Sequence, residues 1–266
     1  MPKTRRQTSI EVVSIGNELL IGQTLDTNSN WIAKQVTKHG WTLERVTQLR
    51  DSLVAIQHGI KEALDRKPYL LVTIGGLGPT HDDMTLKGVA KALNRPMAPN
   101  QDALNLIRRH YSAMENTVPL TSHRRKMAIL PEGSKPLPNP IGTAPGVIMK
   151  SGRTMIVSLP GVPGEMRAIF KGSVLPLLQT PHSGPPQEAF MFLTGIIESA
   201  LAPVLQQAQR RYPGLYFKSH PRGKETGVRP LIQIHIYSTA PGSQQKIGNA
   251  LTFLVHTLSS LAPRTY

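Results

Sequence analysis

The sequence predicts an α/β fold in which helices cover both faces of an open, mostly parallel sheet, followed by a small α+β domain. Three observations support this prediction. Strand-like and helix-like segments alternate through the first two thirds of the 266 residues. Residues 70–74 are apolar apart from Thr73, which is typical of a central parallel strand. Beyond residue 186 the pattern changes to strands with one polar face.

The expected strands of the first domain are short segments, and all of them except the second are largely apolar. They cover residues 11–15, 41–48, 70–74, 146–149 and 154–159. A turn at Ser151-Gly152 is expected to join the last two strands as a hairpin.

The expected helices of this domain have apolar residues at the spacing of one helical face. In chain order they carry Ile32, Leu53, Leu86, Leu104 and Met166. Asp51 and Ser52 are expected to cap the second helix, and Pro163 suits the first turn of the last one. In such a fold, ligands bind at the carboxyl ends of the strands, where the corners at 16–18 and 75–83 lie.

Two domains are predicted, over residues 1–180 and 186–266, with residues 180–186 as a proline-containing linker. In the second domain the expected strands cover 189–193, 215–219 and 231–237, and a final helix covers about 244–258. Another helix is expected around Leu201, with Pro203 near its first turn. Lys218, Ser219 and His220 lie at a strand end, either near a neighbouring active site or on an exposed sheet face.

Composition limits the class of protein. Hydrophobic residues make up 39% of the chain and charged residues 18%, which is typical of a globular protein. The absence of cysteine excludes disulfides, thiolate metal sites and a cysteine nucleophile. No apolar run approaches the roughly 20 residues of a membrane span. The basic N-terminus lacks the apolar core of a secretion signal, so a cytoplasmic location is expected.

The net charge is +15, and it is spread along the chain. There are 23 basic and 13 acidic side chains up to residue 185, and 8 and 3 from residue 186 onward. A spread excess attracts anions weakly and does not favour a nucleic-acid partner. Arg124, Arg125 and Lys126 form the densest interior cluster. They are expected either to be solvated or to supply positive charge to a diphosphate.

The strongest functional signal is the stretch YLLVTIGGLGPTHDDMT, residues 69–85. Gly75, Gly76 and Gly78 allow backbone N–H groups to approach an anion, and a helix N-terminus follows them. A tight turn in an α/β core is the structural alternative for this corner.

Two adjacent carboxylates, Asp82 and Asp83, follow the glycines. Beside a bound phosphate they require a cation, which predicts a phosphate and metal site with Asp82 and Asp83 as ligands and Mg²⁺ as the default ion. Thr80 and Thr85 are expected to bond phosphate oxygens or to cap the helix. One of the aspartates is alternatively a plain helix cap.

Further candidates lie in three other loops. Glu18 follows the first strand as a metal ligand or base. Asp26 and Asn28 are expected to bind ribose hydroxyls or a base edge, or else to form Asx-turns and a helix cap. The loops 138–146 and 158–166 are rich in glycine and proline, which lets a flat ligand lie against the backbone. The alternative for residues 160–163 is an ordinary turn into a helix. Their candidate residues are Gly142, Thr143 and Gly161.

Other catalytic motifs are missing from the sequence. It has no G-x-S-x-G elbow, no Walker sequence and no H-E-x-x-H pair, and its G-x-G patterns do not fit the dinucleotide fingerprint. A dehydrogenase is therefore excluded.

Taken in order, the motifs GNELLIGQTLDTN, GGLGPTHDDMT, NPIGTAPG and LPGVPGEM resemble the N-terminal domain of the CinA family of competence/damage-inducible proteins. That domain is similar to the molybdopterin-binding fold of MogA, MoaB and gephyrin. The match covers about residues 10–178 and implies a three-layer, molybdopterin-binding-like domain that is usually homo-oligomeric. Residues 186–266 resemble the small subdomain that follows in CinA-like proteins. The further amidase domain, which deamidates nicotinamide mononucleotide, is not expected in this chain.

The resemblance implies a metal-dependent pyrophosphatase acting on ADP-ribose or a similar nucleoside diphosphate sugar, with Mg²⁺, Mn²⁺ or Co²⁺. Asp83 falls on the family's metal and pyrophosphate aspartate, with Asp82 and Glu18 as further catalytic candidates. The glycines of residues 75–78 fall on the phosphate loop, and Thr85 is the matching hydroxyl.

Two positions depart from the family pattern. Asn17 stands where aspartate is common, and Asp82 stands where molybdopterin enzymes typically have a basic residue. The first weakens the expectation of catalysis and the second argues against pterin adenylylation. The alternative function is a module that binds an anionic nucleotide or a pterin, or an adenylyltransferase-like protein with little hydrolysis.

Overall fold

The structure of the chain is a computed structural model that describes residues 9–112, 121–178, 186–222 and 231–259. The chain divides into two compact units, one covering residues 1–37 and 41–181 and the other covering 38–40 and 182–266. The expected linker at 180–186 lies outside the described residues except for Pro186, so the domain boundary itself stays a prediction.

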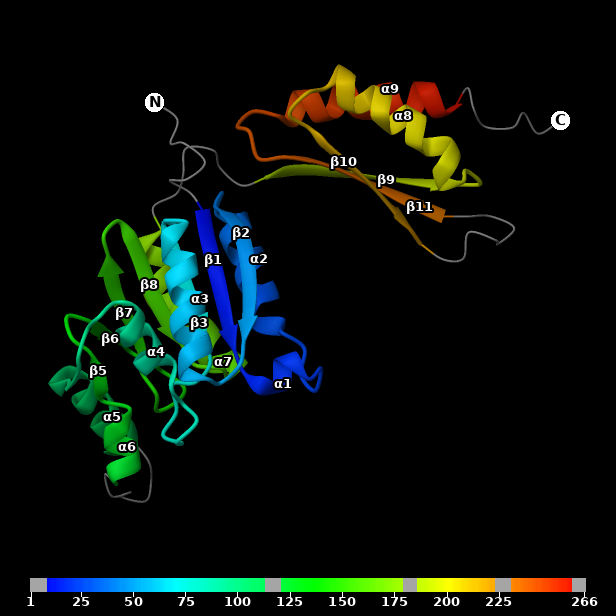
Figure 1. Ribbon diagram of the computed structural model, residues 1–266. Coiled ribbons are helices and arrows are strands. Elements are labelled where there is room, and N and C mark those ends of the chain that lie inside the picture. The colour runs from blue at the N-terminus through cyan, green and yellow to red at the C-terminus, as the bar shows by residue number, and fades with distance from the viewer. Residues whose placement is uncertain (1–8, 113–120, 179–185, 223–230, 260–266) are drawn as a thin grey trace. The chain divides into compact units, whose positions relative to one another are not determined.

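The first unit is built on a six-stranded sheet in the order β2-β1-β3-β8-β7-β6 (Figure 1). Its strands are β1 (Ser9–Ile15), β2 (Thr42–Leu49), β3 (Leu70–Ile74), β6 (Lys135–Leu137), β7 (Gly146–Ser151) and β8 (Thr154–Leu159). The pairs among β2, β1, β3 and β8 are parallel, whereas β7 is antiparallel to both of its neighbours. This confirms the open, mostly parallel sheet.

Helices cover both faces of this sheet, so the unit has three layers (Figure 1). On one face lie α3 (Leu53–Asp65), α4 (Thr85–Ala92) and α5 (Gln101–Ser112). On the other lie α2 (Thr27–Lys38) and α7 (Pro163–Ile169). The alternation of side chains along a strand explains both cores: Val13 packs with Ile60 of α3, whereas the adjacent Val12 packs with Ile32 of α2.

Shorter elements complete the first unit. They are α1 (Asn17–Leu20), α6 (Ser122–Lys126), the paired strands β4 (Met97–Pro99) and β5 (Ile129–Pro131), a π-helical turn at Phe170–Val174 and a 3₁₀ turn at Leu175–Leu177. The hairpin between β7 and β8 is present, with Ser151 paired to Thr154. Its two-residue turn is Gly152-Arg153, and Gly152 supplies the required positive φ of 54°.

The prediction that Asp51 and Ser52 cap α3 through their side chains is wrong. Ser52 occupies the N-cap position, but its side chain makes no capping hydrogen bond. Asp51 Oδ2 instead accepts a hydrogen bond from the backbone N–H of Asn17 at 2.9 Å. The carboxylate thus satisfies a free amide at the start of α1 rather than one of its own helix.

The second unit is a three-stranded antiparallel sheet in the order β10-β11-β9, with two helices on one face (Figure 1). The strands are β9 (Gln187–Thr194), β10 (Tyr216–Pro221) and β11 (Leu231–Ser238), and the helices are α8 (Glu198–Arg211) and α9 (Gln244–Ser259). Pro203 lies inside α8 and not near its first turn, because the helix begins at Glu198. Among the described residues no helix is both long enough and apolar enough to cross a membrane.

Candidate functional site

The carboxyl ends of β1, β3 and β8 open into a cavity of about 630 Å³. Its walls include Ile15 and Gly16 after β1, residues 74–79 after β3 and residues 160–163 after β8. This is the edge at which parallel α/β sheets bind ligands, and the volume is that of a small-molecule site.

Ten of the fourteen residues predicted for the site line this cavity. They are Glu18, Asp26, Asn28, Gly75, Gly76, Gly78, Asp82, Asp83, Thr143 and Gly161. Lys126 lines a neighbouring cavity of about 110 Å³ together with Gly76 and Asp83. Gly142 lines another, of about 220 Å³, next to Thr143. Thr80 and Thr85 line none of these three cavities.

The glycine loop after β3 needs glycine for two reasons. Gly75 and Gly76 have φ values of +100° and +63°, in the left-handed region that side chains disfavour. There is also no room: a Cβ on Gly75 would lie 2.3 Å from the carbonyl oxygen of Ile15, and one on Gly76 would lie 2.3 Å from Thr85 Oγ1. The loop can therefore approach β1 and the start of α4 only without side chains at these positions.

Three consecutive backbone amides of this loop are free to bind a ligand. The N–H of Gly75 donates to the carbonyl of Leu159 at 2.9 Å. Within the part of the chain that the structure describes, the N–H groups of Gly76, Leu77 and Gly78 have no hydrogen-bond partner. All three residues line the main cavity. Successive unpaired amides of this kind form a concave site for an anion.

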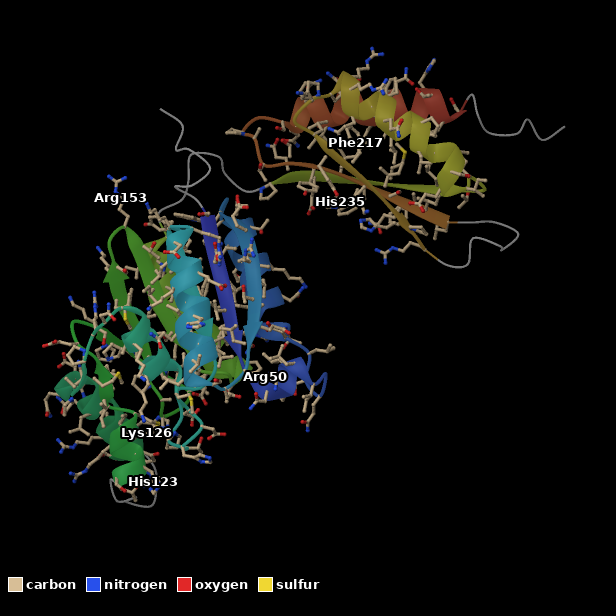
Figure 2. The ribbon with its side chains drawn as sticks, in the orientation of Figure 1. Arg50, His123, Lys126, Arg153, Phe217 and His235 are labelled. Carbon is tan, nitrogen blue, oxygen red and sulfur yellow. The ribbon has the colours of Figure 1, made fainter. Side chains whose placement is uncertain are left out.

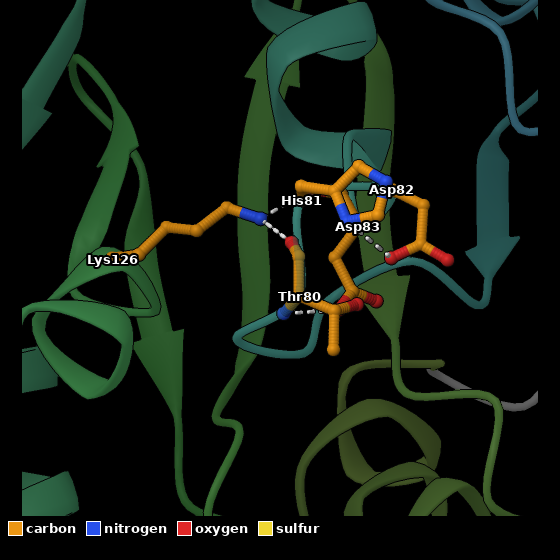
Figure 3. Close-up of polar contacts among 5 residues, drawn as sticks. All are labelled: Thr80, His81, Asp82, Asp83 and Lys126. Atoms are coloured by element: carbon orange, nitrogen blue, oxygen red, sulfur yellow. Dashed lines mark hydrogen bonds and ion pairs between the residues drawn. The ribbon is translucent and has the colours of Figure 1, made fainter.

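Asp83 organises the turn that follows (Figure 3). Its Oδ2 accepts hydrogen bonds from the backbone N–H of Thr80 at 2.8 Å and from the Thr80 hydroxyl at 2.5 Å. Neither Asp82 nor Asp83 caps α4, because Met84 occupies the N-cap position without a side-chain bond. The plain-cap alternative for these aspartates is therefore wrong.

Lys126 reaches this turn from α6 (Figures 2 and 3). Its Nζ donates to the backbone carbonyl of Thr80, and to that of Asp83 at 2.9 Å. Burial lowers the pKa of this ammonium, and the Asp83 carboxylate opposes that effect. The cation is thus bonded to the loop itself.

Metal ligands are sparse at the site. Asp82 and Glu18 are exposed, and Asp82 lies 3.9 Å from His81 Nδ1. In the described ranges, no three or more His, Asp or Glu side chains gather in a group that could hold a metal ion.

Two polar side chains at the start of α2 bond to neighbouring segments: Asp26 to β1 and Asn28 to the loop after β8. Asp26 Oδ1 accepts the N–H of Ser29 at 2.9 Å, which is a helix cap, and Oδ2 accepts the hydroxyls of Ser14 and Ser29 at 2.7 and 2.6 Å. Burial raises the pKa of Asp26, but these hydrogen bonds outweigh it and leave the pKa below its ordinary value. Asn28 Nδ2 donates to the carbonyl of Gly161 at 2.7 Å, while its buried Oδ1 has no partner among the described residues.

Residues 11–180 match the family model described as a probable molybdopterin binding domain. The solved structure of CinA from Thermoplasma acidophilum, described as having unknown function, is 38% identical with a TM-score of 0.60, over 65% of this chain and 99% of that one. The chain belongs to the CinA-like proteins with a molybdopterin binding domain. Proteins of Pyrobaculum calidifontis and Aeropyrum pernix are each 41% identical to this CinA-like chain, over 94% and 91% of its length and 95% and 90% of theirs.

The structure of this CinA-like chain adds residues that the sequence reasoning missed. Asn139 Nδ2 donates to Glu165 Oε2 at 2.6 Å and to the carbonyl of Ala144 at 2.8 Å, and its Oδ1 accepts the N–H of Gly142 at 2.9 Å. A Cβ on Gly142 would lie 2.2 Å from the Glu165 carboxyl group. Asn139 therefore joins the two glycine-rich loops, and an asparagine before Pro-Ile-Gly is the Asx-turn signal that indicates it.

An aromatic side chain also borders the cavity. Tyr111 of α5 lines it, and the guanidinium of Arg124 lies 4.2 Å from the centre of the Tyr111 ring. The sequence does not single out Tyr111 for the site, because helical spacing does not show which side chains border a distant loop.

Proposed function

We propose that the main cavity binds an organic phosphate of the pterin or nucleotide type, with the phosphate on the amides of Gly76, Leu77 and Gly78. The three unpartnered amides carry this proposal, since unpaired N–H groups at the wall of a cavity favour a negative charge there. Membership of the molybdopterin binding domain family supports a ligand of this class.

The remainder of the cavity suits a flat ring. Pro160, Val162 and Tyr111 supply apolar surface, and Asn28 supplies an amide group. A ligand with a phosphate at one end and a heterocycle at the other would use both the amides and this surface.

Calorimetric titration of the chain with AMP and with adenosine tests the proposal. Two or three charge-assisted hydrogen bonds, at about 1.5–3 kcal/mol each, predict that AMP binds at least roughly 100-fold more tightly than adenosine. A phosphorylated and an unphosphorylated pterin form a second matched pair. Equal affinity within both pairs, or no binding of either phosphorylated compound, would contradict the proposal.

A second candidate function is the metal-dependent hydrolysis of a nucleoside diphosphate sugar such as ADP-ribose. The observation that favours it is that Asp82, Asp83 and Glu18 line the same cavity as the free amides. One Asp83 oxygen already accepts two hydrogen bonds, so few protein ligands are left for an ion. Mg²⁺ is commonly bound by one or two carboxylates together with substrate phosphates, and these residues fit an ion of that kind.

When bound, such an ion polarises the diphosphate and lowers the pKa of a water molecule. The contribution of the chain's own residues to catalysis would be electrostatic. The amides of Gly76 and Gly78 would stabilise the charge that develops on the phosphate, and Asp83 would hold both the loop and the ion.

Release of AMP from ADP-ribose in the presence of Mg²⁺, Mn²⁺ or Co²⁺ tests hydrolysis. Asp83→Asn keeps the acceptor for Thr80 but removes the charge, and we expect it to lower the rate by roughly 100-fold or more. Asp102→Asn, in the first turn of α5, is the matched control and should leave the rate unchanged. If Asp83→Asn turns over ADP-ribose as fast as the unaltered chain does, Asp83 has no role in the mechanism. If no AMP is released with any of the three ions, the chain does not hydrolyse ADP-ribose.

A further inference from the structure

The sheet of the second unit has one face that no described element of that unit covers. Along β11, Ile232, Ile234 and Ile236 are buried against the helices. The residues between them point to the other side and keep part of their surface. This open face consists of Glu188, Phe190 and Phe192 of β9, Tyr216, Lys218 and His220 of β10, and Gln233, His235 and Tyr237 of β11. Figure 2 shows His235 on this side of the sheet and Phe217 on the side of the helices.

The strand register arranges these side chains in rows. His235 lies opposite Phe190 on one side and opposite Lys218 on the other. Tyr237 lies opposite Tyr216. In the next row, Gln233 lies between Phe192 and His220. Directly opposed residues of neighbouring strands are close enough for their side chains to interact.

Four of the rings form a continuous row of contacts across all three strands. The centres of Phe190 and His235 lie 4.5 Å apart with 16° between their planes. His235 and Tyr237 follow at 5.2 Å, and Tyr237 and Tyr216 at 4.8 Å. Only the first pair is stacked, since the planes of the other two pairs are tilted by 32° and 47°. The two outer rings of the row stay accessible, with Phe190 48% and Tyr216 47% exposed, whereas His235 and Tyr237 between them are half-buried. Phe192, in the next row, is 62% exposed. Aromatic rings that are open to solvent on a sheet are a surface on which other flat rings stack.

The charge of the open face is positive. Lys218 is exposed on it, and Arg222, just beyond the end of β10, donates to Gln233 Oε1 at 2.9 and 2.6 Å. The carboxylate of Glu188 pairs with His235 Nε2 at 2.9 Å. Self-association through this face would bring four cations together with only two carboxylates into one interface, and this excess of positive charge costs energy. An anionic partner with flat rings avoids that cost.

We propose that the open face binds single-stranded nucleic acid. Bases would stack on Phe190, His235 and the two tyrosines, while phosphates lie near Lys218 and Arg222. Sheets with exposed aromatic side chains bind single strands in this way, by stacking and by charge. The spread of charge along the sequence disfavours such a partner, but a count of charges contains no information on the register that gathers these rings. The inference is independent of the ligand of the first unit.

Fluorescence anisotropy with labelled 12-nucleotide oligothymidine and oligouridine tests the proposal on the full chain. We expect saturable binding at 50 mM salt that weakens as salt rises, because phosphate contacts release counterions. Phe190→Leu and Tyr237→Leu keep apolar volume but remove a ring, and each should weaken binding about fivefold or more. Tyr237→Phe keeps the ring and should retain the affinity. Lys218→Ala should lower the salt slope by about 0.7.

Two controls separate stacking from other effects. Val255→Ala alters an exposed apolar residue of α9, and Lys246→Ala alters a cation that bonds the carbonyl of Pro213; neither belongs to the open face, and neither should change the affinity. Gly76→Ala should also leave oligonucleotide binding intact, which distinguishes this site from the cavity of the first unit. Absence of saturable binding, or equal affinity of the leucine and phenylalanine variants of Tyr237, would overturn the proposal. So would a dimer in sedimentation that Phe190→Leu dissociates without changing oligonucleotide affinity.

Discussion

Gly76→Ala is expected to weaken phosphate-dependent binding of AMP by roughly 100-fold or more, because it displaces two or three charge-assisted hydrogen bonds. Gly76 has a φ of +63°, and an added Cβ would lie 2.3 Å from Thr85 Oγ1. The loop must then move, and its three free amides move with it. Calorimetric titration with AMP measures the loss.

The matched control for this variant is Gly152→Ala. Gly152 also has a positive φ, of 54°, but nothing lies within 4 Å of its added Cβ, and it belongs to the turn between β7 and β8. It therefore imposes the same backbone strain, about 1 kcal/mol, away from the cavity. If both variants bind AMP like the unaltered chain, the amides of the glycine loop do not hold the phosphate. If both lose binding equally, the effect is a general loss of stability, which thermal unfolding will show.

Arg66→Met is expected to lower the free energy of unfolding by about 3 kcal/mol. Glu11 lies in β1 and is 4% exposed, and Arg66 Nε and Nη2 donate to its carboxylate at 2.8 and 2.6 Å. Removing the guanidinium leaves a buried carboxylate without its counter-charge. The Arg66 side chain is 34% exposed, so solvent screens part of the pair, and the lower end of the 3–5 kcal/mol range for broken buried pairs applies. Urea denaturation measures the change.

A double variant shows whether the loss of stability comes from the unpaired charge of Glu11. Glu11→Leu combined with Arg66→Met removes both charges, and we expect it to recover most of the stability, since an apolar pair often replaces a buried ion pair without loss. Arg153→Met, on the exposed turn between β7 and β8 (Figure 2), is the control and should change stability by less than about 0.5 kcal/mol. A loss below about 1 kcal/mol in Arg66→Met would show that solvent already compensates Glu11.

The long elements of the fold are predictable because each carries its own pattern. Leu70–Ile74 is apolar apart from Thr73 and forms the buried strand β3, and residues 53–64, with their helical spacing, form α3. The strands β4, β5 and β6 escape this reasoning, because three residues are too short to show a period. They form through distant pairing, as Met97 does with Pro131.

The candidate site is predictable where its residues are neighbours in the sequence. Gly75, Gly76 and Asp83 belong to one loop, and they line one cavity. Contacts between loops are not predictable in this way. The bond from Asn28 to Gly161 joins residues 133 positions apart, and only the folded sheet brings them together. Likewise, the alternating pattern of β11 predicts a polar face, but the row of rings from Phe190 to Tyr216 depends on strand register.

The hydrogen bonds of Lys126 affect the affinity with which the cavity could bind a ligand. Its ammonium donates hydrogen bonds to two carbonyls of the turn at 80–83 and so restricts that turn in the absence of a ligand. The entropy of ordering the turn is therefore lost when the chain folds and not when a complex forms. In a preorganised site of this kind, contacts with the ligand contribute to affinity without being offset by the entropic cost of ordering the loop.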